Sequence, residues 1–311
     1  MNFQGGNDMS FLDRTMPYER FGTKDIAKAT NIDEALKLAG MDWKVEARDM
    51  FDANGMRIPG YVANVRRSDN EVLGVVGQNY HIVQNEEAFR FVDSLAGNGF
   101  EFDRAGQFRN GKSIWMMGHL PESKILGDKI DNNLVIVNSH DGSSGVKVMI
   151  TPVRVACANM LNVALAKANR VWNVKHTRHI ATRMDEAMLT LGLATKYMRE
   201  LEKEADVLAV KKITDKQIND IFDIMFPVDV NKDSERKIKN ITIFRKNFFQ
   251  CYDEADLANF KGTAWGAINA MADLVDHSAP NRNTSDYYSN HWNKLLNGHE
   301  KFDTFCKMIR A

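Results

Sequence analysis

The chain has 311 residues, of which 44% are hydrophobic and 26% charged, and its 41 basic residues equal its 41 acidic ones. These values are ordinary for a folded globular protein and exclude a fibrous or largely disordered chain. No apolar run approaches the roughly 20 residues that span a bilayer, and the N-terminus lacks a signal-peptide pattern, so we expect a cytoplasmic protein without membrane contact.

The first part of the sequence mixes short helical and strand patterns. Residues 1–19 show no periodicity, which predicts a flexible tail. Asn31 precedes a helical pattern that Gly40 closes. Strand patterns follow over residues 43–47, 58–65 and 72–76, and the polar turns between them indicate a β-meander. After a helix capped by Asn85, residues 100–107 and 113–120 form a hairpin pattern around the turn 109–111.

Residues 134–165 predict a second hairpin followed by a helix. Residues 134–137 and 146–150 have strand patterns, and the glycine-rich run from Asp141 to Gly145 is a turn between them. Thr151 before Pro152 is typical of a helix start. Apolar residues then recur at helical spacing, namely Val153, Ala156, Cys157, Met160, Leu161, Ala164 and Leu165. We therefore predict a helix from Thr151 that packs on the sheet.

From about residue 181 the sequence favours helices alone. Apolar residues between 184 and 208 predict one long helix, and Thr214 with Gln217 forms a capping box for the next. Further helices are predicted over residues 234–252, 263–277 and 286–310. The predicted fold class is α+β: a tail (1–19), a core domain of antiparallel meander and hairpins with packed helices (20–180), and an all-helical domain (181–311).

Positive charge is concentrated between residues 142 and 184, where the sequence contains no Asp or Glu. Such a segment suits a polyanion, because cations contact phosphates and Trp172 offers a ring on which a base can stack. The alternative is a solvated basic face balanced by acidic helices downstream. The predicted nucleic-acid-binding residues are Lys147, Arg154, Lys167, Arg170, Trp172, Lys175, Arg178 and Arg183, with His140, Ser143 and Ser144 of the turn.

Arg154 has two interpretations within this prediction. In the first turn of the predicted helix, near Ser143 and Ser144, it would suit a phosphate, because helix N-termini attract anions. Alternatively, Arg154 pairs with Asp141 and fixes the turn.

A catalytic or metal-binding set is the second hypothesis for this region. His140 and Asp141 could act as a general acid and base, or His140 could join His176 and His179 on a metal ion. Asp141 before Gly142 is also ordinary turn chemistry, and no HExxH motif accompanies the histidines. Glycine-rich nucleotide loops are absent from the sequence as well. We therefore predict no cofactor, no metal and no catalytic residue, and no hydrolysis of ATP.

Several blocks of the sequence, in order, resemble the phage/plasmid-like family defined by the domain of unknown function 932. The resemblance covers residues 17 to about 277 and implies a protein of phages, prophages or plasmids in a bacterial host cell. The blocks are Phe21-Gly22-Thr23, NIDEALKLAGMDWKVE, VVGQNYHIVQNEEAFRFVDSL, NSHDGSSG, TPVRVACANMLNVAL and GTAWGAINAMADLVDH.

The predicted order of elements is also similar to the topology of the single-strand annealing recombinases. That resemblance implies binding and annealing of single-stranded DNA by a homo-oligomer, without ATP, in replication or recombination. We therefore predict a nucleic-acid-binding protein, with DNA favoured over RNA. Two alternatives remain: an interaction protein that inhibits a host defence or replication protein by direct contact, and a metal-dependent nucleic-acid-processing enzyme that uses His140, Asp141, His176 and His179.

Overall fold

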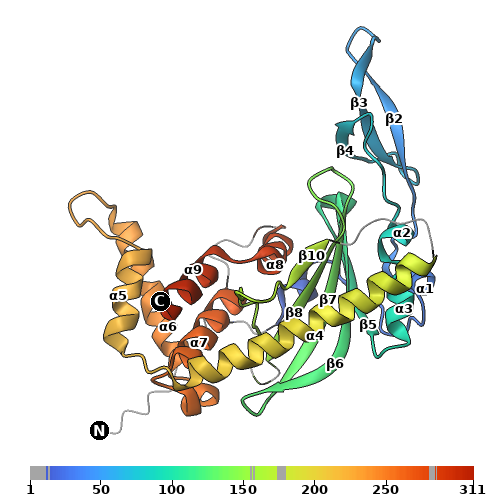
Figure 1. Cartoon of the computed structure of the whole chain (residues 1–311). Coiled ribbons are helices and arrows are strands. Elements are labelled where there is room, and N and C mark those ends of the chain that lie inside the picture. Colours follow the sequence, from blue (N-terminus) through green and yellow to red (C-terminus); the bar gives the residue numbers. More distant parts are fainter. Residues whose placement is uncertain are drawn as a thin grey trace.

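The computed structural model describes residues 12, 15–154, 156, 158–173, 180–279, 284 and 286–311, apart from the side chains of residues 180–184 and 255. The fold is α+β, as predicted: antiparallel strands dominate the N-terminal half, and helices make up the C-terminal part (Figure 1). None of the helices in the described ranges is long and apolar enough to cross a membrane.

The predicted β-meander is a separate three-stranded sheet that projects from the body of the molecule (Figure 1). It consists of β2 (Val45–Phe51), β3 (Arg57–Arg66) and β4 (Val72–Gly77), paired antiparallel. The carboxylate of Asp52 accepts the backbone N–H groups of Asn54 and Met56, which closes the turn at the tip. We call residues 45–77 the arm.

The main sheet lies in the body and is antiparallel throughout. Its strand order is β1-β5-β6-β7-β8-β10, and β9 pairs with β8. The strands are β1 (Lys24–Asp25), β5 (Glu101–Phe108), β6 (Ser113–Ile125), β7 (Asp128–Ser139), β8 (Lys147–Arg154), β9 (Asn159–Met160) and β10 (Val171–Asn173). The hairpin of β5 and β6 is confirmed, and the 3-10 turn η2 (Arg109–Gly111) connects its strands.

Three short helices cover one end of this sheet. The helix α1 (Ile32–Ala39) is confirmed with both caps: the Asn31 side chain accepts the N–H of Glu34, and Gly40 is left-handed. The helix predicted to be capped by Asn85 is instead two, α2 (Asn85–Phe89) and α3 (Val92–Ala96). Gln84 is the N-cap of α2, because the Asn85 side chain is buried and donates to the carbonyl of Met41.

The prediction of a helix from Thr151 is wrong, because β8 continues through Thr151 and Pro152 to Arg154. Its residues pair with β7 over Ile130–Asn133. The chain that follows bonds to distant groups in place of its own backbone: Met160 N–H donates to Asp276 Oδ2, and the carbonyls of residues 161 and 163 accept from the Tyr197 hydroxyl. These long-range partners satisfy the backbone polar groups that a helix would have paired locally.

The C-terminal helices agree with the prediction. They are α4 (Ile180–Val210), α5 (Asp215–Met225), α6 (Glu235–Tyr252), α7 (Ala264–His277), α8 (Tyr287–Asn297) and α9 (Glu300–Arg310), with the 3-10 helix η3 (Ala255–Phe260) after α6. The predicted capping box of Thr214 and Gln217 begins α5. Long α4 runs across the main sheet, and α5, α6, α7 and α9 gather at the end opposite the arm (Figure 1).

One hydrophobic core joins the sheet to the helices. Every residue of α7 is buried, which makes this helix the centre of the helical part. The 3-10 helix η1 (Pro17–Arg20) packs against α8, and there Tyr18 contacts Trp115 of β6 and Trp292 of α8 edge to face. Aromatic pairs of this kind bury large apolar areas, so they connect the two halves firmly.

Candidate functional site

The two arginines of the acid-free segment that the structure describes fully are both buried. Arg154 is 3% exposed and bonds to Asp128 of β7 (Nε to Oδ2, 2.7 Å) and to Asp256 of η3 (Nη1 to Oδ2, 2.8 Å). Asp141 pairs instead with Arg109 at 2.9 Å, so the alternative pair of Arg154 with Asp141 is not formed. Arg170 lies under α8, where its Nη2 donates to the carbonyl of Leu296 at 2.6 Å.

The other predicted residues that the structure describes lie beside different parts of the chain. Lys147 donates to Asn297 Oδ1 at 3.2 Å, and Lys167 is exposed beside Glu200. The half-buried Trp172 packs on the core, with its Nε1 3.5 Å from Thr190 Oγ1. Lys175, His176, Arg178 and His179 lie outside the described residues, and the side chain of Arg183 in α4 is not described. Within the described chain, Arg154 and Arg170 are thus buried, and Lys147 and Trp172 contact neighbouring side chains.

The turn after β7 is locked by internal bonds. His140 is buried, its Nε2 lies 2.8 Å from Asn85 Oδ1, and burial lowers its pKa to about 4, so the imidazole is neutral at pH 7. Asp141 accepts from the hydroxyl of Ser139 and from the N–H of Ser143, while Ser144 is half-buried. Among the described residues, no group of three or more His, Cys, Asp or Glu side chains could hold a metal ion.

A cleft between α6, α7, α8 and α9 gathers cationic side chains that the sequence does not place together. Its volume is about 810 Å³, and none of the described residues that line it is acidic. Lys294 and His291 belong to α8, and Lys301 belongs to α9. His299 immediately precedes α9. Asn240 and Asn247 of α6 lie opposite these residues.

An adjoining pocket of about 550 Å³ shares Asn240 and Lys301 with this cleft and extends it toward the end of α5. Arg236 and Lys237 of α6 line the extension, and its described lining is also free of Asp and Glu. Lys237 is paired with Asp233 at 2.7 Å, whereas Arg236 is exposed. We call the two pockets together the basic cleft.

Positive charges act on each other inside the basic cleft. The pKa of His299 is lowered to about 4. Burial is the largest cause, and the charges of His291, Lys301 and Lys294 add to it. Its Nδ1 is buried without a hydrogen-bond partner in the described chain. Lys301 lies over the rings of Phe244 (4.7 Å) and Phe226 (5.7 Å), and partial burial lowers its pKa. A bound anion would relieve this mutual repulsion.

Aromatic rings and polar groups complete the lining. Tyr287 stacks on His291 with ring centroids 5.6 Å apart, and His291 Nε2 donates to the carbonyl of Asp276. Tyr288 in turn contacts the ring of Tyr287 edge to face. The cleft thus combines point charges, amide donors and ring faces, which are the groups that hold a sugar-phosphate chain and its bases.

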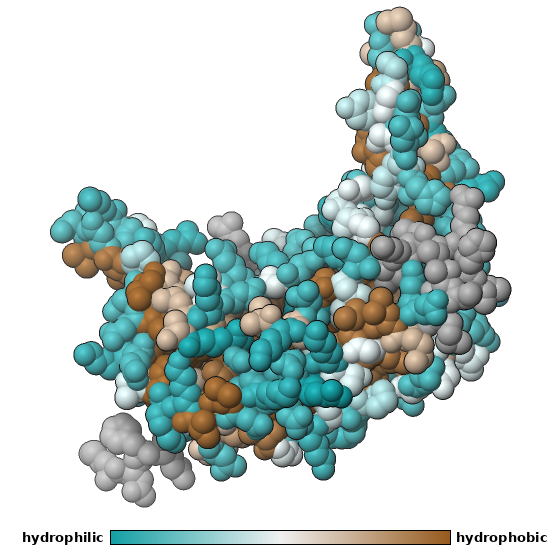
Figure 2. Space-filling model, viewed as in Figure 1, coloured by the Kyte–Doolittle hydropathy of each residue, from teal (hydrophilic) through white to brown (hydrophobic). Residues whose placement is uncertain are grey.

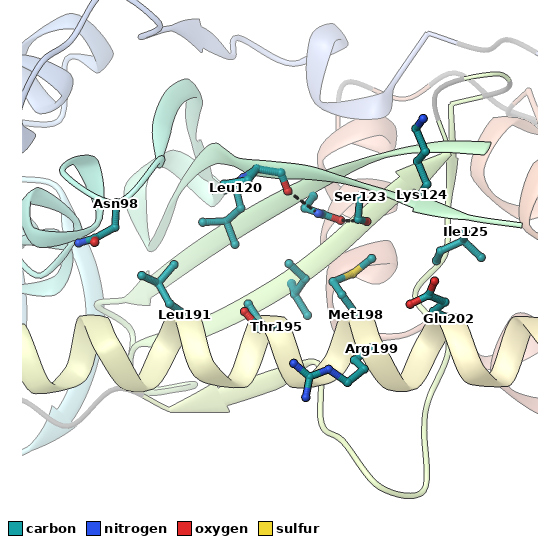
Figure 3. A pocket seen from close by; sticks show the side chains of 14 residues that line it. Asn98, Leu120, Ser123, Lys124, Ile125, Leu191, Thr195, Met198, Arg199 and Glu202 are labelled. Carbon is teal, nitrogen blue, oxygen red and sulfur yellow. Dashed lines mark hydrogen bonds between the residues drawn. The ribbon is translucent and has the colours of Figure 1, made fainter. Parts of the chain in front are cut away.

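A second pocket, of about 510 Å³, lies between α4 and the strand β6 (Figure 3). Its walls are largely apolar, with Leu191 and Met198 of α4 facing Leu120 of β6 (Figure 3). Arg199 and Glu202 both line it, so charges of opposite sign occur together. The basic cleft is therefore the better site for a polyanion.

The protein is an α+β protein with a cationic cleft between the helices of its C-terminal part. Residues 72–296 match the family described as "Domain of unknown function (DUF932)", and because the match covers most of the chain, the protein belongs to that family. No curated protein and no solved structure matches the chain.

Proposed function

We propose that this protein binds single-stranded nucleic acid and that the sugar-phosphate chain lies along the basic cleft. The observation that carries the proposal is the convergence of Lys294, Lys301 and Arg236 with uncharged histidines on a cleft whose described lining contains no carboxylate. The whole chain has a net charge of zero, so any attraction of anions must come from a local group of cations. A cleft lined by charges of one sign concentrates such a local field.

The shape of the cleft favours a chain over a single small anion. The two pockets share Asn240 and Lys301 in their linings, and each has rings beside its cations: Tyr287 in one, Phe226 in the other. Ring faces accept any base, which supports binding with little sequence preference. We extend the proposal to annealing of single-stranded DNA without ATP, by a homo-oligomer encoded by a phage or plasmid.

Removal of single cations from the cleft tests this proposal. We expect Lys294→Gln and Lys301→Gln each to weaken the binding of a fluorescent single-stranded oligonucleotide by roughly three- to tenfold, because each loses a phosphate contact. Fluorescence anisotropy measures the change. Lys37→Gln, an exposed lysine of α1 outside the cleft, is the matched control and should bind like the wild type. Equal affinities for all four proteins would contradict the proposal.

A second candidate function, contact with a host protein, is favoured by the arm. Phe51, Met56 and Tyr61 near its tip are each more than half exposed, and Figure 2 shows hydrophobic surface along this projection. Exposed apolar groups on a projecting sheet are typical of a protein-binding surface. If the wild-type protein had no affinity for oligonucleotides, this function would become the better proposal.

A further inference from the structure

A small polar pocket lies on the other side of the turn between α8 and α9. Its volume is about 230 Å³, and it is lined by the segment that follows β9 and by the ends of the two helices. The lining includes Asn162, Ala168, Arg170, Asn297, Gly298 and Asp303.

Two buried side chains of this lining have polar atoms without partners in the described structure. Arg170 uses Nη2 to bond the carbonyl of Leu296, but its Nη1 has no hydrogen-bond partner. Asn162 donates through Nδ2 to the carbonyl of Leu295, but its Oδ1 accepts nothing. Buried polar atoms are nearly always satisfied, so this donor and this acceptor, both from residues that line one pocket, indicate a ligand.

The third polar group is the carboxylate of Asp303, which burial holds at a raised pKa. It is half-buried and has no hydrogen-bond partner in the part of the chain that the structure describes. A glycine at position 298 leaves room for it, since a Cβ there would lie 2.8 Å from Asp303 Oδ2. A simple anion would suit Arg170 but would be repelled by Asp303. The pocket therefore requires a ligand with acceptors and donors side by side.

We propose that this pocket takes one base of the bound strand, and that guanine fits it best; this inference rests on the proposed function. Guanine presents the acceptors O6 and N7, which suit Arg170, and the N2 amino donor, which suits Asp303 or Asn162. The walls at Ala164, Leu165 and Ala168 are apolar, as the face of a flat ring requires. Extruded bases are recognised in this way, by their edges and faces together.

The position of the pocket agrees with a strand that lies in the basic cleft. Asn297 and Gly298 line the pocket, whereas Lys294, His299 and Lys301 line the cleft, so only the turn between α8 and α9 separates the two sites. Lys147 is bonded to Asn297 at this edge and adds a cation there. A strand whose phosphates contact the cleft can turn one base over this edge.

The test compares two oligonucleotides that differ only in one base. We expect the wild-type protein to bind an oligothymidylate of about ten residues about tenfold more tightly when one central thymine is replaced by guanine. Asp303→Asn should abolish this preference and leave the affinity for the plain oligothymidylate unchanged, because Asp303 does not line the cleft. Ala168→Leu, which fills the pocket, should do the same.

The outcomes separate this inference from the proposed function. Tight binding without a preference for guanine in the wild type, or a preference that persists in both variants, would overturn the inference and leave the proposed function intact. If the wild-type protein bound none of the oligonucleotides, both this inference and the proposed function would be overturned. Because Asp303→Asn replaces only one oxygen by an amino group, retention of the wild-type melting temperature by this variant would exclude unfolding as the cause of a lost preference.

Discussion

His299 is the side chain of the basic cleft whose protonation should respond most to a bound phosphate. Its lowered pKa of about 4 leaves it neutral in the free protein. A phosphate nearby favours the charged imidazolium and raises the pKa, so binding should take up a proton. The titratable groups around it are His291 and Lys294 of α8 and Lys301 of α9, with Glu300 acting on Lys301.

The consequence is a pH dependence with a definite sign. We expect the affinity for a single-stranded oligonucleotide to rise severalfold as the pH falls from about 7.5 toward the pKa of about 4 of free His299, because the bound imidazole takes up its proton above that value. Titration calorimetry in buffers of different ionisation enthalpy measures the proton uptake. His299→Gln should flatten the pH profile. An unchanged profile in that variant would show that another group titrates.

Arg154 connects three elements, because its side chain fastens the end of β8 to β7 and to η3. Its guanidinium bonds to Asp128 and Asp256 and to the carbonyl of Asp256. We expect Arg154→Met to lower the free energy of unfolding by about 2–3 kcal/mol, since two partly buried carboxylates lose their partner.

Urea denaturation measures this change, with Lys167→Met as the control at an exposed position. The control should stay within about 0.5 kcal/mol of the wild type. A similarly small effect of Arg154→Met would mean that the ion pairs contribute nothing to stability.

Local signals in the sequence predict some elements well and one segment wrongly. Caps and periodicity predict α1, α5, α6 and α7 well, because a side chain next to each helix caps its first turn, as Asn31 and Thr214 do. The segment after Thr151 shows the limit of this reasoning. Its helix-start signal is real but local, and it is overridden by pairing with β7 and by bonds to Asp276 and Tyr197, which are distant in sequence.

The candidate site was less predictable than the helices. An acid-free run of sequence says nothing about which cations are buried, and Arg154 finds its carboxylates at residues 128 and 256, outside the run. The basic cleft, in contrast, is assembled from α6, α8 and α9, and the sequences of α6 and α9 contain acids and bases together. Only the fold turns the acidic side chains away from the described lining.

At the scale of the whole molecule, the arm and the helical end stand on either side of a hollowed face (Figure 2). The family match begins at β4 and ends in α8, so it includes β5 to β10, α4 and α7 but excludes β1, β2, β3 and α9. The match therefore ends within the cleft, between Lys294 and His299. The remaining wall, with Lys301, comes from the chain beyond it.

The salt dependence of binding tests the central claim most directly, because released counterions report phosphate contacts. For a single strand that contacts three or four cations of the basic cleft, the logarithm of the association constant should fall against the logarithm of salt concentration with a slope of about −2 to −3. The double variant Lys294→Gln, Lys301→Gln should reduce the steepness of this slope by about 1.4. A flat dependence in the wild type, or equal slopes for the two proteins, would contradict the claim that the basic cleft holds a sugar-phosphate chain.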